Sequence, residues 1–165
     1  MKIGGFFIVA VLALTACSGD PQPREPDPSA TPTSMSTATP PPMPDQATED
    51  SPEGAAAFVI YWVDTLNHAA RTGNTSALSQ ASSTSCAGCA SYINELSEDP
   101  ADARRPTDDF WKLSSVDVGE SRQPILVRTE ASVRTGSSDS KFVFEFELTP
   151  SAPFKVNDLV IVEQP

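Results

Sequence analysis

The spacing of apolar residues divides the chain into stretches with different patterns. An unbroken apolar run covers residues 3–14, directly after Lys2. Residues 18–51 then contain very few large apolar side chains and many prolines. Between residues 55 and 98 the apolar positions recur every three to four residues, which predicts helices. From residue 110 onwards apolar and polar positions alternate, which predicts strands.

The helical pattern predicts one long helix, which begins at Pro52 and ends near Arg71. Ser51 is a suitable N-cap, and proline is favoured at the first helical position. Gly73 suits the left-handed position that follows a helix. The apolar residues of this helix share one side: Phe58, Trp62, Leu66 and Ala69.

Two shorter helices are expected over residues 75–80 and 86–98, before the pattern changes to strands. The four expected strands cover residues 110–118, 125–134, 141–148 and 154–162. A change of parity within the first of them predicts a β-bulge near Ser114. The expected fold class is α+β, in which the long helix and two shorter helices pack on a curved, four-stranded antiparallel sheet.

The apolar run near the start has the features of a secretory signal peptide: a basic residue, an apolar core and small residues at its end. Its last residues, Leu14-Thr15-Ala16-Cys17, resemble a bacterial lipobox. That resemblance implies removal of residues 1–16 and a diacylglycerol on the Cys17 sulfur. The protein is then expected at the extracytoplasmic face of the cell membrane, held by its lipid. The alternatives are a secretory peptide with a chance cysteine and an uncleaved anchor, although the run is shorter than the roughly 20 residues of a membrane span.

Composition separates residues 17–51 from residues 52–165. Ten of the chain's 16 prolines lie between Pro21 and Pro52. A segment with so little apolar surface cannot offset the entropy cost of ordering, so residues 17–51 are expected to form a disordered tether that follows the lipidated Cys17. Residues 52–165 have the length of one ordinary domain.

The charge balance is acidic, with a formal net charge of −11 for the whole chain. Residues 52–165 contain nine lysines and arginines against sixteen aspartates and glutamates. Such a domain is repelled by phosphate backbones and by anionic lipid head groups. Nucleic acid is therefore excluded as a partner, and attachment to the membrane must come from the lipid on Cys17.

The motif Cys86-Ala87-Gly88-Cys89 lies at the start of the third expected helix. If Cys17 is acylated, Cys86 and Cys89 form an even pair in an oxidising compartment, which favours a structural disulfide. A redox-active pair is the alternative, because a helix N-terminus stabilises a thiolate. A zinc site is disfavoured because His68 is the chain's single histidine and zinc needs further ligands. No metal and no cofactor is expected.

Two further groups of residues are candidates for a site. Asp64 and His68 lie four residues apart on the long helix, so they can act as an acid–base pair or simply form a surface ion pair. The second group is aromatic and can either line an apolar cavity between helix and sheet or fill the core. Its members are Trp62, Trp111, Phe142, Phe144 and Phe146.

The order of the expected elements resembles the nuclear transport factor 2-like cone fold, also called cystatin-like. Residues 51–59, 73–78 and 86–89 more closely resemble an uncharacterised family, a domain of unknown function found in lipoproteins of high-GC Gram-positive bacteria. This resemblance implies a fold and a location, and it supplies no assigned active site.

The leading hypothesis is a lipid-anchored, non-enzymatic module that binds a small apolar ligand or another envelope protein, as a monomer or a weak homodimer. One alternative is a cone-fold enzyme of the isomerase or dehydratase type that uses Asp64 and His68. The other is a thiol–disulfide protein that uses Cys86 and Cys89.

Overall fold

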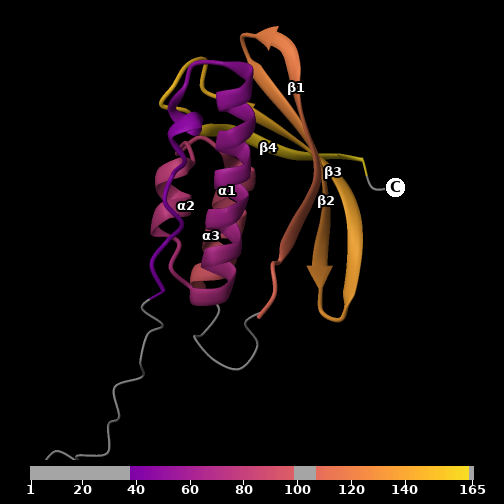
Figure 1. Cartoon of the computed structure of the whole chain (residues 1–165). Helices are drawn as coiled ribbons and strands as arrows, with labels where there is room; N and C mark the ends of the chain where they lie inside the picture. The colour runs from indigo at the N-terminus through magenta and orange to yellow at the C-terminus, as the bar shows by residue number, and fades with distance from the viewer. Residues whose placement is uncertain (1–37, 99–106, 164–165) are drawn as a thin grey trace, which may run out of the picture. The chain divides into compact units, whose positions relative to one another are not determined.

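The computed structural model describes residues 38–98 and 107–163 (Figure 1). Within these residues, three α-helices pack on a four-stranded antiparallel sheet, which confirms the α+β class. The strand order is β1-β2-β3-β4, so β1 and β4 form the two edges. The elements are the 3₁₀-helix η1 (Asp45–Thr48), α1 (Pro52–Thr72), α2 (Ser76–Ala81), α3 (Ala87–Glu98), β1 (Trp111–Arg122), β2 (Ile125–Thr135), β3 (Ser138–Leu148) and β4 (Val156–Glu163).

Helix α1 begins and ends where its capping residues predict. The Ser51 hydroxyl accepts a hydrogen bond from the Gly54 N–H at 3.0 Å, and Pro52 occupies the first helical position. At the other end Gly73 adopts a left-handed φ of 75°, which a residue with a Cβ rarely adopts, and its N–H bonds to the Ala69 carbonyl. The buried residues of α1 run from Gly54 to Ala70, and the helix packs against η1, α2 and the strands β1 and β2.

The sheet turns alternate residues of each strand towards the helices. In β2 these residues are Ile125, Val127, Thr129, Ala131 and Val133, all of which are buried. Phe144, Phe146 and Leu148 continue the same face on β3. The register between β1 and β2 shifts between Leu113 and Ser115, which confirms the bulge predicted near Ser114.

The folded part extends further towards the N-terminus than the predicted boundary at Pro52. Residues 45–48, assigned to the tether, form η1, and Ala47 is only 1% exposed in the core. The sequence pattern does not indicate η1, because alanine is too small to stand out among apolar positions. The many prolines do not exclude it either, because proline fits the extended position just before η1. The predicted signal peptide (residues 1–16) and Cys17 lie outside the described residues. Among the described residues, no helix is long and apolar enough to cross a membrane.

Candidate functional site

The five aromatic residues considered as a cavity lining lie in the core between α1 and the sheet. Trp62, Trp111, Phe144 and Phe146 are fully buried, and Phe142 is partly buried against them. The rings of Trp111 and Phe144 stack with their centroids 4.0 Å apart, and Trp62 meets Phe146 edge-on at 5.4 Å. These contacts occupy the space that an open aromatic cavity needs, so these residues act as core.

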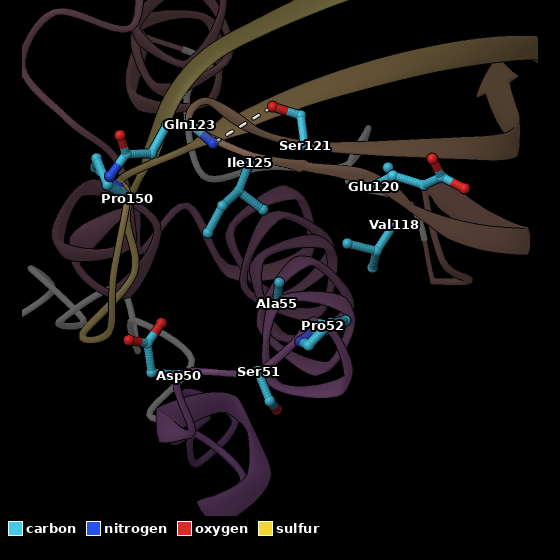
Figure 2. A pocket seen from close by; sticks show the side chains of 11 residues that line it. Asp50, Ser51, Pro52, Ala55, Val118, Glu120, Ser121, Gln123, Ile125 and Pro150 are labelled. Carbon is cyan, nitrogen blue, oxygen red and sulfur yellow. Dashed lines mark hydrogen bonds between the residues drawn. The ribbon is translucent and has the colours of Figure 1, made fainter.

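A cavity of about 390 Å³ lies instead between the N-terminal end of α1 and the hairpin that joins β1 and β2 (Figure 2). We refer to it as the α1–hairpin cavity. Its volume is in the range of cavities that hold small organic molecules. Its apolar lining consists of Pro52, Ala55, Val118, Ile125 and Pro150. Its polar lining consists of Asp50, Ser51, Gly119, Glu120, Ser121 and Gln123.

Backbone packing at the start of α1 holds one wall of this cavity in place. The carbonyl oxygen of Glu49 lies so close to Gly54 that a Cβ at residue 54 would collide with it. The Ser51 hydroxyl, bonded to the Gly54 N–H, holds the chain on the other side of the same turn. Asp50, which lies between Glu49 and Ser51 in the chain, lines the cavity.

The opposite wall comes from the sheet. Ile125 is the first residue of β2, pairs with Leu148 of β3 and is 8% exposed. Val118 and Glu120 belong to the end of β1, beside the hairpin. Val118 and Ile125 pair within the sheet, whereas the β1–β2 register shifts between Val118 and Arg122. The buried residues Ala55 and Ile125 form an apolar floor, while the exposed lining residues form a polar rim: Asp50, Glu120, Ser121 and Gln123.

The cavity carries negative charge. Asp50 and Glu120 extend from different walls (Figure 2), and none of the lining residues is a lysine, arginine or histidine. Fixed carboxylates in a concave site attract cations and repel anions. The lining therefore favours a neutral or positively charged guest that also has an apolar part.

Asp64 and His68, the candidate acid–base pair, both lie on α1 but differ in burial. Asp64 is exposed, whereas His68 is buried, and no ion pair joins them in the described part of the chain. Burial lowers the pKa of His68, and the nearby positive charge of Arg71 lowers it further. Reduced hydration raises the pKa of Asp64, with Asp109 adding to the rise and Arg71 opposing it. Neither side chain borders the α1–hairpin cavity.

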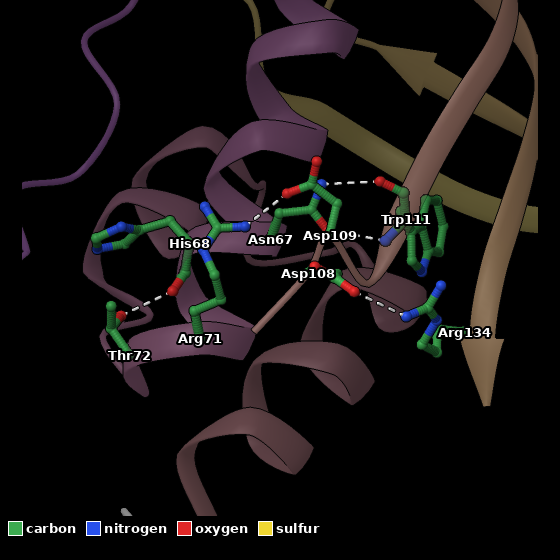
Figure 3. A network of polar contacts seen from close by, with 8 residues as sticks. All are labelled: Asn67, His68, Arg71, Thr72, Asp108, Asp109, Trp111 and Arg134. Atoms are coloured by element: carbon green, nitrogen blue, oxygen red, sulfur yellow. Dashed lines mark hydrogen bonds and ion pairs between the residues drawn. The ribbon is translucent and has the colours of Figure 1, made fainter. Parts of the chain in front are cut away.

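Polar residues in the C-terminal half of α1 bond to residues at the start of β1 (Figure 3). The Asn67 amide donates to the Trp111 carbonyl at 2.9 Å and accepts from the Trp111 N–H at 2.8 Å. Arg71 pairs with Asp109 at 2.6 Å, one turn further along the helix. These contacts attach the start of β1 to α1, whereas the buried Nε2 of His68 and Nε1 of Trp111 have no hydrogen-bond partner among the described residues.

The Cys86–Cys89 disulfide is formed, as predicted. Both cysteines are buried, with 1% and 0% of their surface exposed. Gly88, between them, lies against the carbonyl oxygen of Leu159, where a Cβ would collide. A thiol–disulfide protein needs a sulfur that another thiol can reach, so this burial supports a structural bridge that docks α3 onto β4.

Sequence reasoning did not identify the α1–hairpin cavity. Ser51 and Pro52 mark the helix start, but they contain no signal that the β1–β2 hairpin lies opposite. Among the described residues, no group of three or more histidines, cysteines, aspartates or glutamates is placed to hold a metal ion.

Comparison with known proteins finds one family. The model of a family of unknown function (DUF6318) matches residues 28–114, which is more than half of the chain. The match covers all three helices and ends within β1. No curated protein and no solved structure matches the chain. The likeness to nuclear transport factor 2 therefore stays a prediction.

Proposed function

We propose that this chain, which belongs to that family of unknown function, is a lipid-anchored, extracytoplasmic module that binds a small organic molecule in the α1–hairpin cavity. One observation carries the proposal: the aromatic core is closed, whereas this cavity of about 390 Å³ combines an apolar floor with a polar rim. Sites with those properties are typical of small-molecule binding.

The charges of the rim favour a particular class of ligand. Asp50 and Glu120 provide carboxylates, and Ser121 and Gln123 provide hydrogen-bonding groups, whereas Ala55 and Ile125 provide the apolar floor. An organic amine with a short apolar body satisfies all three features. A carboxylate of the same size would meet the two acids without a compensating cation.

The lining supports binding more than catalysis. It contains no histidine, cysteine or lysine, which are the usual proton carriers and nucleophiles at neutral pH. The two carboxylates come from different walls, and the hydroxyl of Ser51 is already engaged with the Gly54 N–H.

Removing the two carboxylates tests the ligand class. In the double variant Asp50→Asn/Glu120→Gln we expect butylamine to bind about tenfold more weakly than in the wild type, because a loss of about 1.4 kcal/mol corresponds to two weak, exposed charge interactions. Isothermal titration calorimetry measures this difference, with butyrate as the matched anionic probe. Asp117→Asn is the control, because Asp117 is an exposed acid of the same strand that does not line the cavity.

The proposal fails if butyrate binds as well as butylamine, or if the double variant binds butylamine as the wild type does. A similar loss in Asp117→Asn would assign the effect to net charge and would also contradict a site in the cavity.

The lipid anchor is the second part of the proposal. Its support is the lipobox-like Leu14-Thr15-Ala16-Cys17 after a short apolar run, followed by a proline-rich stretch. With a thioether-linked lipid on Cys17, the folded part is held outside the cell while its acidic surface stays away from anionic head groups.

Replacing Cys17 by alanine is expected to release the protein from the membrane. Without the sulfur no lipid can be attached, and nearly all of the protein should move from the membrane fraction to the soluble fraction in detergent-free buffer. Fractionation followed by immunoblotting measures this change, with Ser18→Ala as the control for a substitution at the same junction. Unchanged membrane association of Cys17→Ala would show that the anchor assignment is wrong.

A further inference from the structure

The chain that leads into α1 forms one wall of the α1–hairpin cavity. We call residues 40–50 the N-terminal strap, which contains η1 and ends at Asp50. Asp50 lines the cavity, and so do Ser51 and Pro52, which directly follow the strap (Figure 2). The position of one of the two carboxylates in the lining therefore depends on where the strap lies.

Few side chains attach the N-terminal strap to the rest of the domain. Ala47 is buried and belongs to the same core cluster as Ala55 and Phe58 of α1. Pro40 and Pro41 are half-buried, and the other residues of the strap are exposed. An alanine side chain buries little apolar surface, so the free energy that holds the strap in place is small compared with that of a core helix such as α1.

Hydrogen bonds within the strap are local. The Ala47 N–H donates to the Pro44 carbonyl at 3.0 Å, and the Glu49 N–H donates to the Gln46 carbonyl at 3.1 Å. Each of these bonds joins residues that are three apart in the chain. They give the strap its shape, but they do not attach it to α1 or to the sheet.

One backbone contact sets the position of Asp50 against α1. The Glu49 carbonyl lies so close to Gly54 that no Cβ fits between them, and it also accepts a hydrogen bond from the Ser51 N–H at 2.9 Å. Asp50 is the residue between Glu49 and Ser51. If the strap detaches, Glu49 leaves Gly54 and the Asp50 carboxylate moves away from the cavity, whereas the Ser51 hydroxyl still caps α1.

We propose that the N-terminal strap completes the α1–hairpin cavity around its ligand, so that ligand binding and docking of the strap favour each other. This inference rests on the proposed function, because it needs a ligand that contacts Asp50. A ligand that binds only the docked arrangement shifts the equilibrium towards that arrangement. By linkage, docking of the strap raises the affinity for the ligand by the same factor.

This coupling connects occupancy of the cavity to the attachment at the membrane. With a lipid on Cys17, a detached strap adds residues 40–50 to the chain that joins the domain to its anchor. When extended, those residues span about 35 Å at most. An empty cavity therefore lets the domain reach further from the membrane than an occupied cavity does.

A substitution that detaches the strap tests the coupling in one direction. In the chain from residue 17 with Cys17→Ala, the variant Ala47→Asp places a carboxylate at a buried position, which favours the detached strap. Gln46→Asp is the matched control, because it adds the same charge at the exposed neighbouring position. We expect the dissociation constant of butylamine, measured by isothermal titration calorimetry, to be about fivefold higher or more in Ala47→Asp than in Gln46→Asp. Circular dichroism establishes that both variants are folded.

Hydrogen exchange tests the coupling in the other direction and needs no substitution in the domain. The amides of Ala47 and Glu49 report on the strap, because an isolated turn of this length does not persist in water. At a butylamine concentration of nine times the dissociation constant, we expect their exchange to slow about tenfold. The Gly73 amide, at the other end of α1, should exchange at an unchanged rate.

The outcomes separate the coupling from the proposed function. If butylamine binds in the α1–hairpin cavity but neither slows exchange in the strap nor distinguishes Ala47→Asp from Gln46→Asp, the coupling is wrong and the binding site stands. Equal slowing at Gly73 would assign the effect to global stabilisation and would also overturn the coupling. A second hollow of about 480 Å³ is lined by Tyr92 of α3 and Ile161 of β4. Binding there, or no binding of butylamine at all, would overturn both proposals.

Discussion

Truncating Trp62 to alanine is expected to lower the free energy of unfolding by about 3–5 kcal/mol, the range for a fully buried aromatic residue. Trp62 is 0% exposed, and its ring contacts the rings of Trp111 and Phe146. Its Nε1–H also donates to the Ser82 hydroxyl at 2.9 Å. The backbone of the sheet is held by its ladder and cannot collapse into the space left by the indole. Chemical denaturation measures the loss.

The matched control is Ile60→Ala, two residues away on the exposed side of α1. Ile60 is 44% exposed, so we expect a change of less than about 1 kcal/mol. Trp62→Phe should fall between the two, because it keeps most of the ring contacts and loses the hydrogen bond to Ser82. A loss below about 1 kcal/mol for Trp62→Ala would mean that Trp62 borders open space, contrary to the packed core.

Replacing Gly88 by alanine is expected to destabilise the protein by about 1–3 kcal/mol, the cost of overpacking. Helix propensity alone predicts the opposite sign, because alanine is favoured over glycine by about 1 kcal/mol within a helix. The difference arises because a Cβ on Gly88 would collide with the backbone carbonyl of Leu159. Backbone cannot rotate away as a side chain does, so α3 would have to move off β4.

Ser91→Ala provides the control in the same helix. Ser91 is exposed and its hydroxyl bonds to the Ala87 carbonyl, so its replacement should leave stability unchanged or slightly raised. Thermal unfolding of both variants is sufficient, because only Gly88→Ala is expected to lower the stability. If Gly88→Ala is as stable as the wild type, then α3 does not dock on β4 through this glycine.

Much of the fold follows from local signals that the sequence displays. Ser51 and Gly73 mark the two ends of α1, because capping is a property of a few consecutive residues. The alternation of apolar residues places β2 and β3, and the change of parity near Ser114 places the bulge in β1. Each of these features depends on residues that are neighbours in the chain.

The remaining features depend on contacts between distant residues. The role of Asn67 is apparent only once Trp111, 44 residues later, lies beside it. Ala47 joins the core although proline-rich sequence surrounds it. From the sequence alone, the aromatic residues are compatible with both a filled core and an open cavity. The stacking of Trp111 on Phe144 in the structure decides for the filled core.

The candidate site belongs to this second group. Asp50 and Ser51 precede a helix, while Glu120 and Ser121 end a strand, and neither pair has an unusual sequence. They line one cavity because α1 packs on β1 and β2 with its start opposite the hairpin. Sequence patterns identify single helices and strands, but they do not show which of them lie next to each other in space.

The most direct test of the central claim is a ¹⁵N nuclear magnetic resonance titration of the chain from residue 17, with Cys17→Ala, against a panel of small amines, alcohols and carboxylic acids. A ligand site in the α1–hairpin cavity predicts that amines shift the backbone amides of Ala55, Gly119 and Ser121 most, and that the acids shift them least. Shifts that cluster instead around Tyr92 and Ile161, or no shift with any compound at millimolar concentration, would contradict it.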